Sequence, residues 1–117
     1  MMRYINDKGA ITISNDVITY VAGAAATSCF GVKGMAVRSM TDGLVHLLRR
    51  EAMSKGVLVT ENDDDTITID LHIMIDHGVN IAAVGESIIN EVRYVVTRTT
   101  GVEVRTVNVF VDSIMID

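Results

Sequence analysis

The chain has 117 residues, which suits one domain, and we expect a single unit spanning residues 1–117. Hydrophobic residues make up 49% of it, but no apolar run approaches the length of a membrane span. The sequence therefore predicts a cytoplasmic protein without direct membrane insertion. The formal net charge of −5 works against a polyanionic partner, so nucleic acid is not expected. The single Cys29 cannot form an internal disulfide, which fits a reducing compartment.

The first third of the chain predicts a strand, a helix and a second short strand. Gly9–Ser14 alternates and is rich in β-branched residues, which is typical of a strand. Ser14 or Asn15 is expected to cap a helix that ends at Gly31 and Gly34, before a brief strand over Met35–Ser39. The predicted apolar stripe of the helix comprises Val17, Ile18, Val21, Ala22, Ala25 and Cys29.

A second helix is predicted from Thr41 or Asp42 to Gly56, and a hairpin follows it. Its arms are Val57–Thr60 and Thr66–Asp76, joined by the polar turn Glu61–Asp65. The second arm alternates strictly, which predicts one buried face and one open face. The expected buried side chains are Ile67, Ile69, Leu71, Ile73 and Ile75.

The last third of the chain predicts a long helix and a bulged strand. Asn80 is expected to cap the helix and Gly101 to end it in a left-handed conformation. Its predicted stripe comprises Ile81, Val84, Ile88, Val92 and Val95. The final strand has valines at even positions 102 and 104, then at odd positions 107, 109 and 111. This change of parity predicts a β-bulge near Arg105 and Thr106.

Together these elements predict an α+β fold, with a mainly antiparallel sheet and helices packed on one face in two layers. Several segments, in this order and spacing, resemble the alkaline-shock-protein family of Gram-positive bacteria, also called the envelope stress response family. The segments that carry the resemblance are Ile13–Ile18, Gly31–Gly34, Ser54–Val59, Ile67–Leu71, His77–Ile81, Thr100–Val104 and Val107–Val111. The chain looks like a short form of the family, without the long polar tails of its founding members.

The resemblance implies a non-enzymatic cytoplasmic protein that forms homo-oligomers. It also implies a role in cell-envelope stress or homeostasis, and association with the membrane through a small membrane-anchored protein partner. No catalytic residues and no cofactor are implied. Short relatives of this kind also suggest an accessory role in a fatty-acid kinase system.

Gly31-Val32-Lys33-Gly34 offers an alternative function. Two glycines around a lysine have the form of the loop with which KH domains clamp a nucleic-acid backbone. A KH-like nucleic-acid-binding module is therefore the alternative hypothesis, with Gly31, Lys33 and Gly34 as its backbone-binding turn. A helix end followed by a turn explains the same glycines, and no basic or aromatic cluster lies beside them in the sequence.

No spacing in the sequence predicts a catalytic or metal site. His46, His72 and His77, with Asp70 and Asp76, do not follow a metal-binding motif, and alternate strand residues lie about 7 Å apart. Cys29 falls on an apolar stripe, which favours a structural thiol.

The sequence places a candidate interaction surface on the open face of the predicted sheet. If Val107, Val109 and Val111 face the core, Asn108, Phe110 and Asp112 face outward on the same strand. His72 and Met74 face outward on the long strand, and the two strands are expected to be neighbours. An exposed Phe110 would anchor self-association. The alternative is that the apolar chain end, residues 114–116, covers Phe110.

Overall fold

The structure is a computed structural model, and it describes residues 1–36 and 56–116. The predicted second helix, with His46, and the end of the predicted strand Met35–Ser39 lie outside the described residues. The elements are β1 (Met2–Asn6), β2 (Gly9–Ile13), α1 (Asn15–Thr27), β3 (Val32–Met35), β4 (Val57–Glu61), β5 (Ile67–Asp76), α3 (Ile81–Thr100) and β6 (Val104–Met115).

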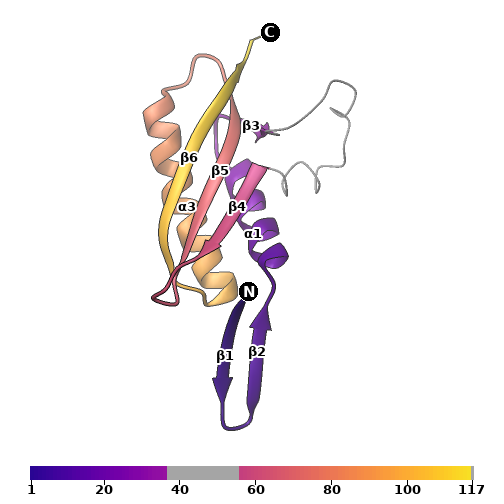
Figure 1. The fold of residues 1–117 in the computed structure, drawn as a ribbon. Coiled ribbons are helices and arrows are strands. Elements are labelled where there is room, and N and C mark those ends of the chain that lie inside the picture. The colour runs from indigo at the N-terminus through magenta and orange to yellow at the C-terminus, as the bar shows by residue number, and fades with distance from the viewer. Residues whose placement is uncertain (37–55, 117) are drawn as a thin grey trace.

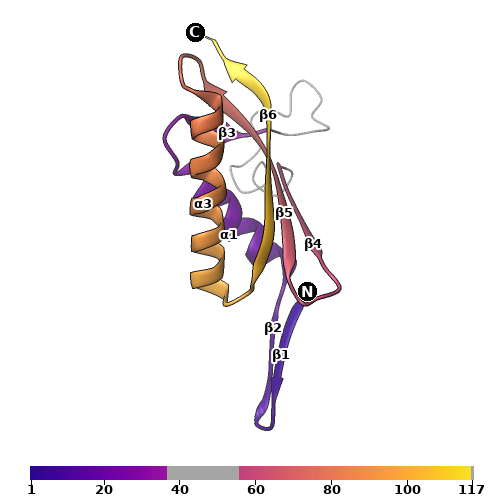
Figure 2. The same ribbon diagram turned by 90° about the vertical axis from the view of Figure 1, so that its left-hand side faces the viewer.

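The body of the molecule has two layers, and the predicted α+β fold class is confirmed. Figure 2 shows α1 and α3 together on one side of the sheet that β3, β4, β5 and β6 form. The other side of this four-stranded sheet is the outer face, which is turned toward the viewer in Figure 1. β1 and β2 form a separate two-stranded hairpin that projects from the end of the body.

β5 is the central strand of the sheet, and it is long enough to pair with two short strands, one after the other, along one of its sides. β4 pairs antiparallel with one half of it, from Ile67 to Leu71, and β3 pairs antiparallel with the other half. β6 runs parallel along the opposite side of β5, which it reaches through the crossover helix α3. β3 and β4 therefore share one flank of β5, and β6 occupies the other.

The predicted alternation of β5 is confirmed, because every second side chain enters the core. Ile67, Ile69, Leu71 and Ile73 are fully buried, and Ile75 is 1% exposed. On β6, Val107 is buried as predicted, but Val109 is only half-buried. We attribute this difference to the position of β6 at the edge of the sheet.

The predicted bulge in β6 is confirmed, and a second bulge was missed. Ile67 pairs with Val104 and the next residue, Thr68, pairs with Thr106, so Arg105 is the extra residue. The register shifts again because Ile73 pairs with Val111 and Met74 pairs with Ser113, which leaves Asp112 unpaired. Between these two bulges the ladder from Thr106 to Val111 is regular.

The caps of both described helices agree with the predictions. Ser14 accepts a hydrogen bond from the amide of Asp16, Asn80 accepts one from the amide of Ala83, and Gly101 adopts φ of 77°. α1 ends at Thr27, earlier than predicted. Gly31 follows in a left-handed conformation with φ of 89°, and β3 begins at Val32. Gly34 therefore lies in a strand.

The apolar stripes of the helices differ from the predictions at their ends. In α1, Val17 is 47% exposed, and Cys29 lies beyond the last helical residue. In α3, Ile81 is 43% exposed and Val95 is half-buried, whereas Val96 is fully buried. The buried residues of α3 are four apart, a spacing that keeps them close to one side of the helix: Val84, Ile88, Val92 and Val96.

Candidate interaction surface

The outer face of the sheet brings together the side chains that point away from the helices on β5 and β6. β5 contributes Thr68, Asp70, His72, Met74 and Asp76, each of which is half-buried. The prediction that β5 and β6 are neighbours is confirmed by their ladder, in which His72 pairs with Phe110 and Asp70 pairs with Asn108. Because paired residues point to the same side of a sheet, these four side chains share the outer face.

The His72 and Phe110 rings form the centre of this face. Their centroids are 4.7 Å apart and their planes are inclined by 12°, so the rings are stacked. His72 Nδ1 lies 2.9 Å from Asp112 Oδ2, so this carboxylate contacts the edge of the imidazole. Phe110 is 44% exposed, so a large part of the stacked ring remains open to solvent.

A hydrogen bond joins the next pair of outward side chains along β5 and β6. Asn108 Nδ2 donates to Asp70 Oδ1 at 2.9 Å, directly across the two strands. Leu58 on β4 pairs with Asp70 on its other side and is 52% exposed, so it extends the face with a further apolar side chain. Met74 pairs with Ser113, beyond the second bulge. The outer face thus carries exposed apolar side chains, Leu58 and Phe110, beside the hydrogen-bonded pair of Asp70 and Asn108.

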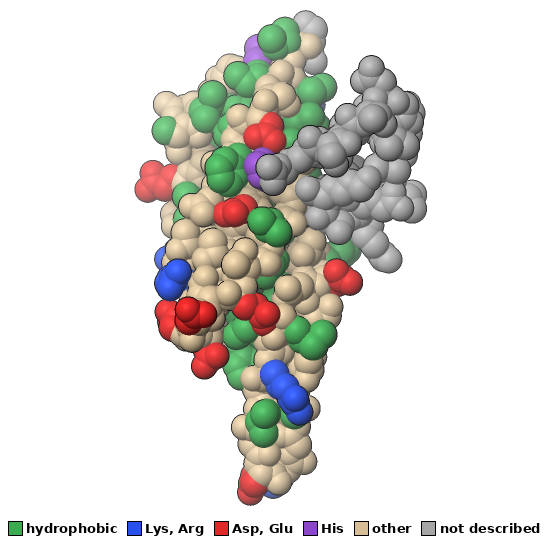
Figure 3. Space-filling view, in the orientation of Figure 1, with side chains coloured by type: hydrophobic (Ala, Val, Ile, Leu, Met, Phe, Trp, Pro, Cys, Tyr) green, Lys and Arg blue, Asp and Glu red, His purple; other side chains and the backbone are tan. Residues whose placement is uncertain are grey.

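The charges around this centre are mainly acidic. Asp70, Asp76 and Asp112 all point to the outer face or its edge. Lys33 Nζ lies 3.4 Å from Asp76 Oδ1, so this lysine is engaged by one of the acids. Figure 3 shows acidic side chains spread over this face around hydrophobic ones. The field over the surface favours a cationic partner.

The residues predicted from the sequence meet on this face. His72 and Phe110 are stacked, and Asn108 and Met74 lie on the same ladder to either side of them. The apolar chain end does not cover Phe110, because β6 continues through Met115 and Ile116 is 80% exposed. Sequence reasoning missed the contact of Asp112 with His72. Alternation along the strand already predicted that Asp112 faces outward, and the apolar Ile114, at an even position after Val111, was the available signal for the second bulge.

The segment Gly31–Gly34 has a different setting from the loop that its sequence suggested. Val32, Gly34 and Met35 pair with β5, and Lys33 is the extra residue where the register shifts. Gly31, which precedes them, is buried. A β-carbon built on Gly31 would lie 3.1 Å from a methyl of Val84, so the glycine serves a close contact between β3 and α3. The Lys33 side chain points toward Asp76.

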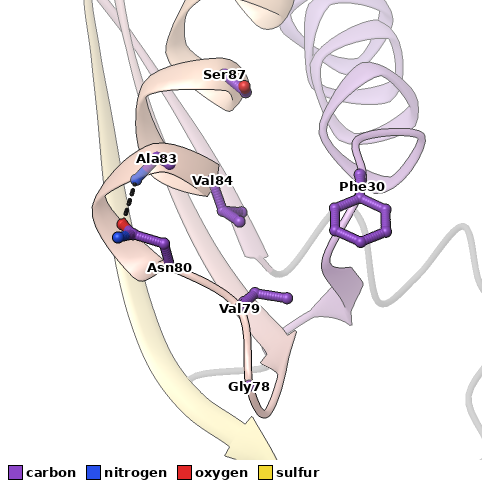
Figure 4. Close-up of a pocket in the computed structure, with 7 residues that line it drawn as sticks. All are labelled: Phe30, Gly78, Val79, Asn80, Ala83, Val84 and Ser87. Carbon is purple, nitrogen blue, oxygen red and sulfur yellow. Dashed lines mark hydrogen bonds between the residues drawn. The ribbon is translucent and has the colours of Figure 1, made fainter.

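A separate pocket of about 450 Å³ lies between the end of α1 and the start of α3 (Figure 4). Phe30, Val79 and Val84 give it apolar walls, and Phe30 is 87% exposed. Its polar group Asn80 is already occupied, because Oδ1 accepts the Ala83 amide at 2.9 Å. The lining therefore offers the Ser87 hydroxyl but no acid or base.

Over residues 1–36 and 56–116, no group of three or more His, Cys, Asp or Glu side chains could hold a metal ion. Asp70 and His72 instead pair with Asn108 and Asp112 of the neighbouring strand. Both side chains are therefore engaged by contacts to β6.

Cys29 lies on the rim of a neighbouring hollow, with Glu91 and Asn90 across from it. Its Sγ lies 3.4 Å from the Ala25 carbonyl, and burial together with the charge of Glu91 raises the pKa of the thiol. Because the thiolate is the nucleophile, we expect iodoacetamide at pH 8 to alkylate Cys29 at least severalfold more slowly in the native chain than in the urea-unfolded chain. Mass spectrometry over time measures both rates, and equal rates would contradict the prediction.

By its fold the chain is a two-layer α+β protein, and comparison with known sequences defines it further. The sequence model of the alkaline shock protein 23 family, described as having a cell envelope-related function, matches residues 4–116. The chain therefore belongs to this family, as its resemblance predicted. Across the described residues, no helix is long and apolar enough to cross a membrane.

Two relatives cover nearly the whole chain. The Bacillus subtilis protein YloU is 39% identical over 109 residues, which are 92% of this chain and 90% of the relative. The Streptococcus pyogenes protein Spy1614 is 39% identical over 114 residues, or 96% of this chain and 93% of the relative. Both relatives are described as uncharacterized proteins. Comparison with solved structures gives no significant match.

Proposed function

We propose that this chain is a non-enzymatic scaffold protein that self-associates, acts through a protein partner and serves cell-envelope homeostasis or stress tolerance. Its family, with a cell envelope-related function, supports the envelope role. The observation that carries the interaction role is the exposed Phe110 ring, stacked on His72 at the centre of the outer sheet face.

The geometry of this face suits an interface. An aromatic ring that is already fixed by stacking loses little side-chain freedom when a partner covers it. An apolar centre within a polar rim is the usual composition of a binding surface. Here the centre comprises Phe110 and His72, with the apolar Met74 and Leu58 nearby. Asp76 and Asp112 lie toward the border of the face, and Asp70 lies between Leu58 and Asn108.

The acidic side chains of the outer face also indicate the chemistry of the protein partner. Membrane-anchored proteins carry an excess of Lys and Arg in the cytoplasmic segments next to their spans. A basic segment of this kind complements Asp70, Asp76 and Asp112. The proposed partner is a small membrane-anchored protein, which would bring a cytoplasmic chain to the membrane without inserting it.

The nucleic-acid alternative has less support. A KH-type clamp is a loop whose backbone is free to approach phosphates, whereas Val32, Gly34 and Met35 pair with β5 on either side of Lys33. Lys33, the cation of this segment, lies beside Asp76, and the neighbouring acidic face repels a polyanion.

The substitution Phe110→Asp tests the proposal. We expect the variant to remain folded by circular dichroism, because the ring is 44% exposed, and to show a lower oligomeric mass by light scattering. Ile81→Asp is the matched control, since Ile81 is 43% exposed and an acidic residue suits the first turn of a helix. An oligomer that survives Phe110→Asp unchanged, or a wild-type chain that stays monomeric, contradicts the proposal.

A further inference from the structure

β6 has a free side. The strand has 12 residues and bonds to β5 along one edge, and no other strand among residues 1–36 and 56–116 pairs with its second edge. In a parallel pair, about half of the backbone N–H and C=O groups of an edge strand point away from the partner strand. Figure 1 shows β6 at the border of the sheet, where half of its backbone groups would point outward.

The regular part of this edge has definite limits. At one end, Arg93 from α3 donates to the Arg105 carbonyl at 3.1 Å, which occupies that acceptor within the chain. At the other end, the bulge at Asp112 breaks the ladder. The stretch between them, Thr106–Val111, is uncharged, unbulged and composed of β-branched residues, phenylalanine and asparagine. Such a stretch has high strand propensity and pairs readily with another strand.

The core beneath this edge is incompletely covered. The inward side chains of β5 are at most 1% exposed, whereas Val109 and Val111 of β6 are half-buried although they pack against the same core. A strand added beside β6 would cover the remaining surface of both valines. The apolar surface and the free backbone groups therefore favour the same position for a partner.

The charges decide between two ways of joining two copies. Stacking the outer faces of two copies would bring Asp70, Asp76 and Asp112 of each against the same acids of the other, which is repulsive. At the edge, by contrast, Arg105 and Asp112 lie at opposite ends of the uncharged stretch. Within one chain Arg105 Nη1 lies 3.5 Å from Asp64 Oδ2 and Asp112 lies 2.9 Å from His72, so a contact between copies would be shared with these neighbours. An antiparallel copy of β6 would place each arginine near the other copy's aspartate.

We propose that β6 pairs antiparallel with β6 of a second copy, which extends the sheet across a two-fold axis at Val109. Val109 then faces its own counterpart, and Phe110 lies opposite Asn108 of the second copy. The two Phe110 rings are diagonal neighbours on the outer face, within reach of each other. At each end of the stretch Arg105 then lies opposite Ser113 of the second copy, next to that copy's Asp112. Such an interface is isologous and closes as a dimer. This inference rests on the self-association proposed above and names its contact.

Hydrogen exchange on the unaltered chain tests the edge directly. We expect amide exchange across Thr106–Val111 to slow at least severalfold between dilute and concentrated samples, because pairing buries the outward amides. The amides of β4 serve as the internal reference and should not change. An oligomer in which the exchange of Thr106–Val111 is independent of concentration overturns the edge pairing but leaves self-association standing. A chain that is monomeric at every concentration overturns both.

A charge exchange tests the register. Arg105→Asp and Asp112→Arg should each raise the dimer Kd by about tenfold at low salt, because each loses two exposed ion pairs between the copies. Each also loses a contact within its own chain, Arg105 with Asp64 and Asp112 with His72. Asp64→Asn and His72→Gln, which remove those contacts but keep Arg105 and Asp112, are the matched controls and should leave Kd nearly unchanged. The double variant should recover most of the affinity, since it restores both pairs with reversed sign. Arg3→Asp, on the exposed hairpin, controls for net charge. Circular dichroism checks folding, and sedimentation gives Kd. Single variants without effect, or a double variant weaker than either single one, overturn the register.

Discussion

Replacing Ile73 with alanine is expected to lower the free energy of unfolding by about 2–5 kcal/mol. Ile73 is fully buried at the middle of β5, between Met35 on β3 and Val111 on β6. Truncation removes most of its buried side chain and leaves a cavity, because the strands on both sides hold the backbone in place. Urea unfolding monitored by circular dichroism measures the change.

Ile5→Ala is the matched control for this substitution. Ile5 is also in a strand but is 71% exposed, so its truncation should change the free energy of unfolding by less than about 0.5 kcal/mol. If both variants lose the same free energy, the core does not lie under β5. The assigned face of the strand would then be wrong.

Gly56→Ala is expected to cost about 1–3 kcal/mol, although it adds only one methyl group. A β-carbon at this position would lie 2.9 Å from the Ala36 carbonyl oxygen and 3.1 Å from that of His72. Those two residues are themselves joined, since the Ala36 amide donates to the His72 carbonyl at 2.8 Å. The added methyl group therefore has to push the end of β3 away from β5.

Gly85→Ala provides the opposite result in the same chain. No atom lies within 4 Å of a β-carbon built on Gly85, which is inside α3. Alanine is the better helix former, so this variant should gain about 0.5–1 kcal/mol. Thermal unfolding of the two variants side by side tests the contrast. A Gly56→Ala chain as stable as the parent would mean that the backbones around Gly56 can separate freely.

The elements that bury a regular face could be predicted from the sequence. The alternation from Ile67 to Ile75 identifies β5, and the change of parity between Val104 and Val107 identifies the bulge at Arg105. Both signals exist because a buried face selects apolar side chains at fixed intervals. The caps at Ser14, Asn80 and Gly101 were predictable for a different reason, since each uses a side chain or conformation that suits a helix end.

Features without a buried face could not be predicted in this way. β1 leaves Tyr4 and Ile5 exposed, so its sequence carries no alternation that marks a strand. The parallel direction of β6 relative to β5 depends on the crossover through α3, and periodicity carries no information on direction. The outward position of His72 and Phe110 followed from parity, whereas their stacking depends on the register between the two strands.

The central position of β5 has a consequence for how the chain opens. Each of the other strands of its sheet is bonded to β5, so detaching β5 dissolves the whole ladder and the sheet is expected to open as one cooperative unit. The β1–β2 hairpin closes its own ladder and joins the body through the buried Met2 and the 3.2 Å bond from the Tyr4 hydroxyl to the Gly101 carbonyl. An isolated hairpin is marginally stable, so this arm can fray while the body stays folded. The chain thus combines a rigid unit with a unit of low local stability.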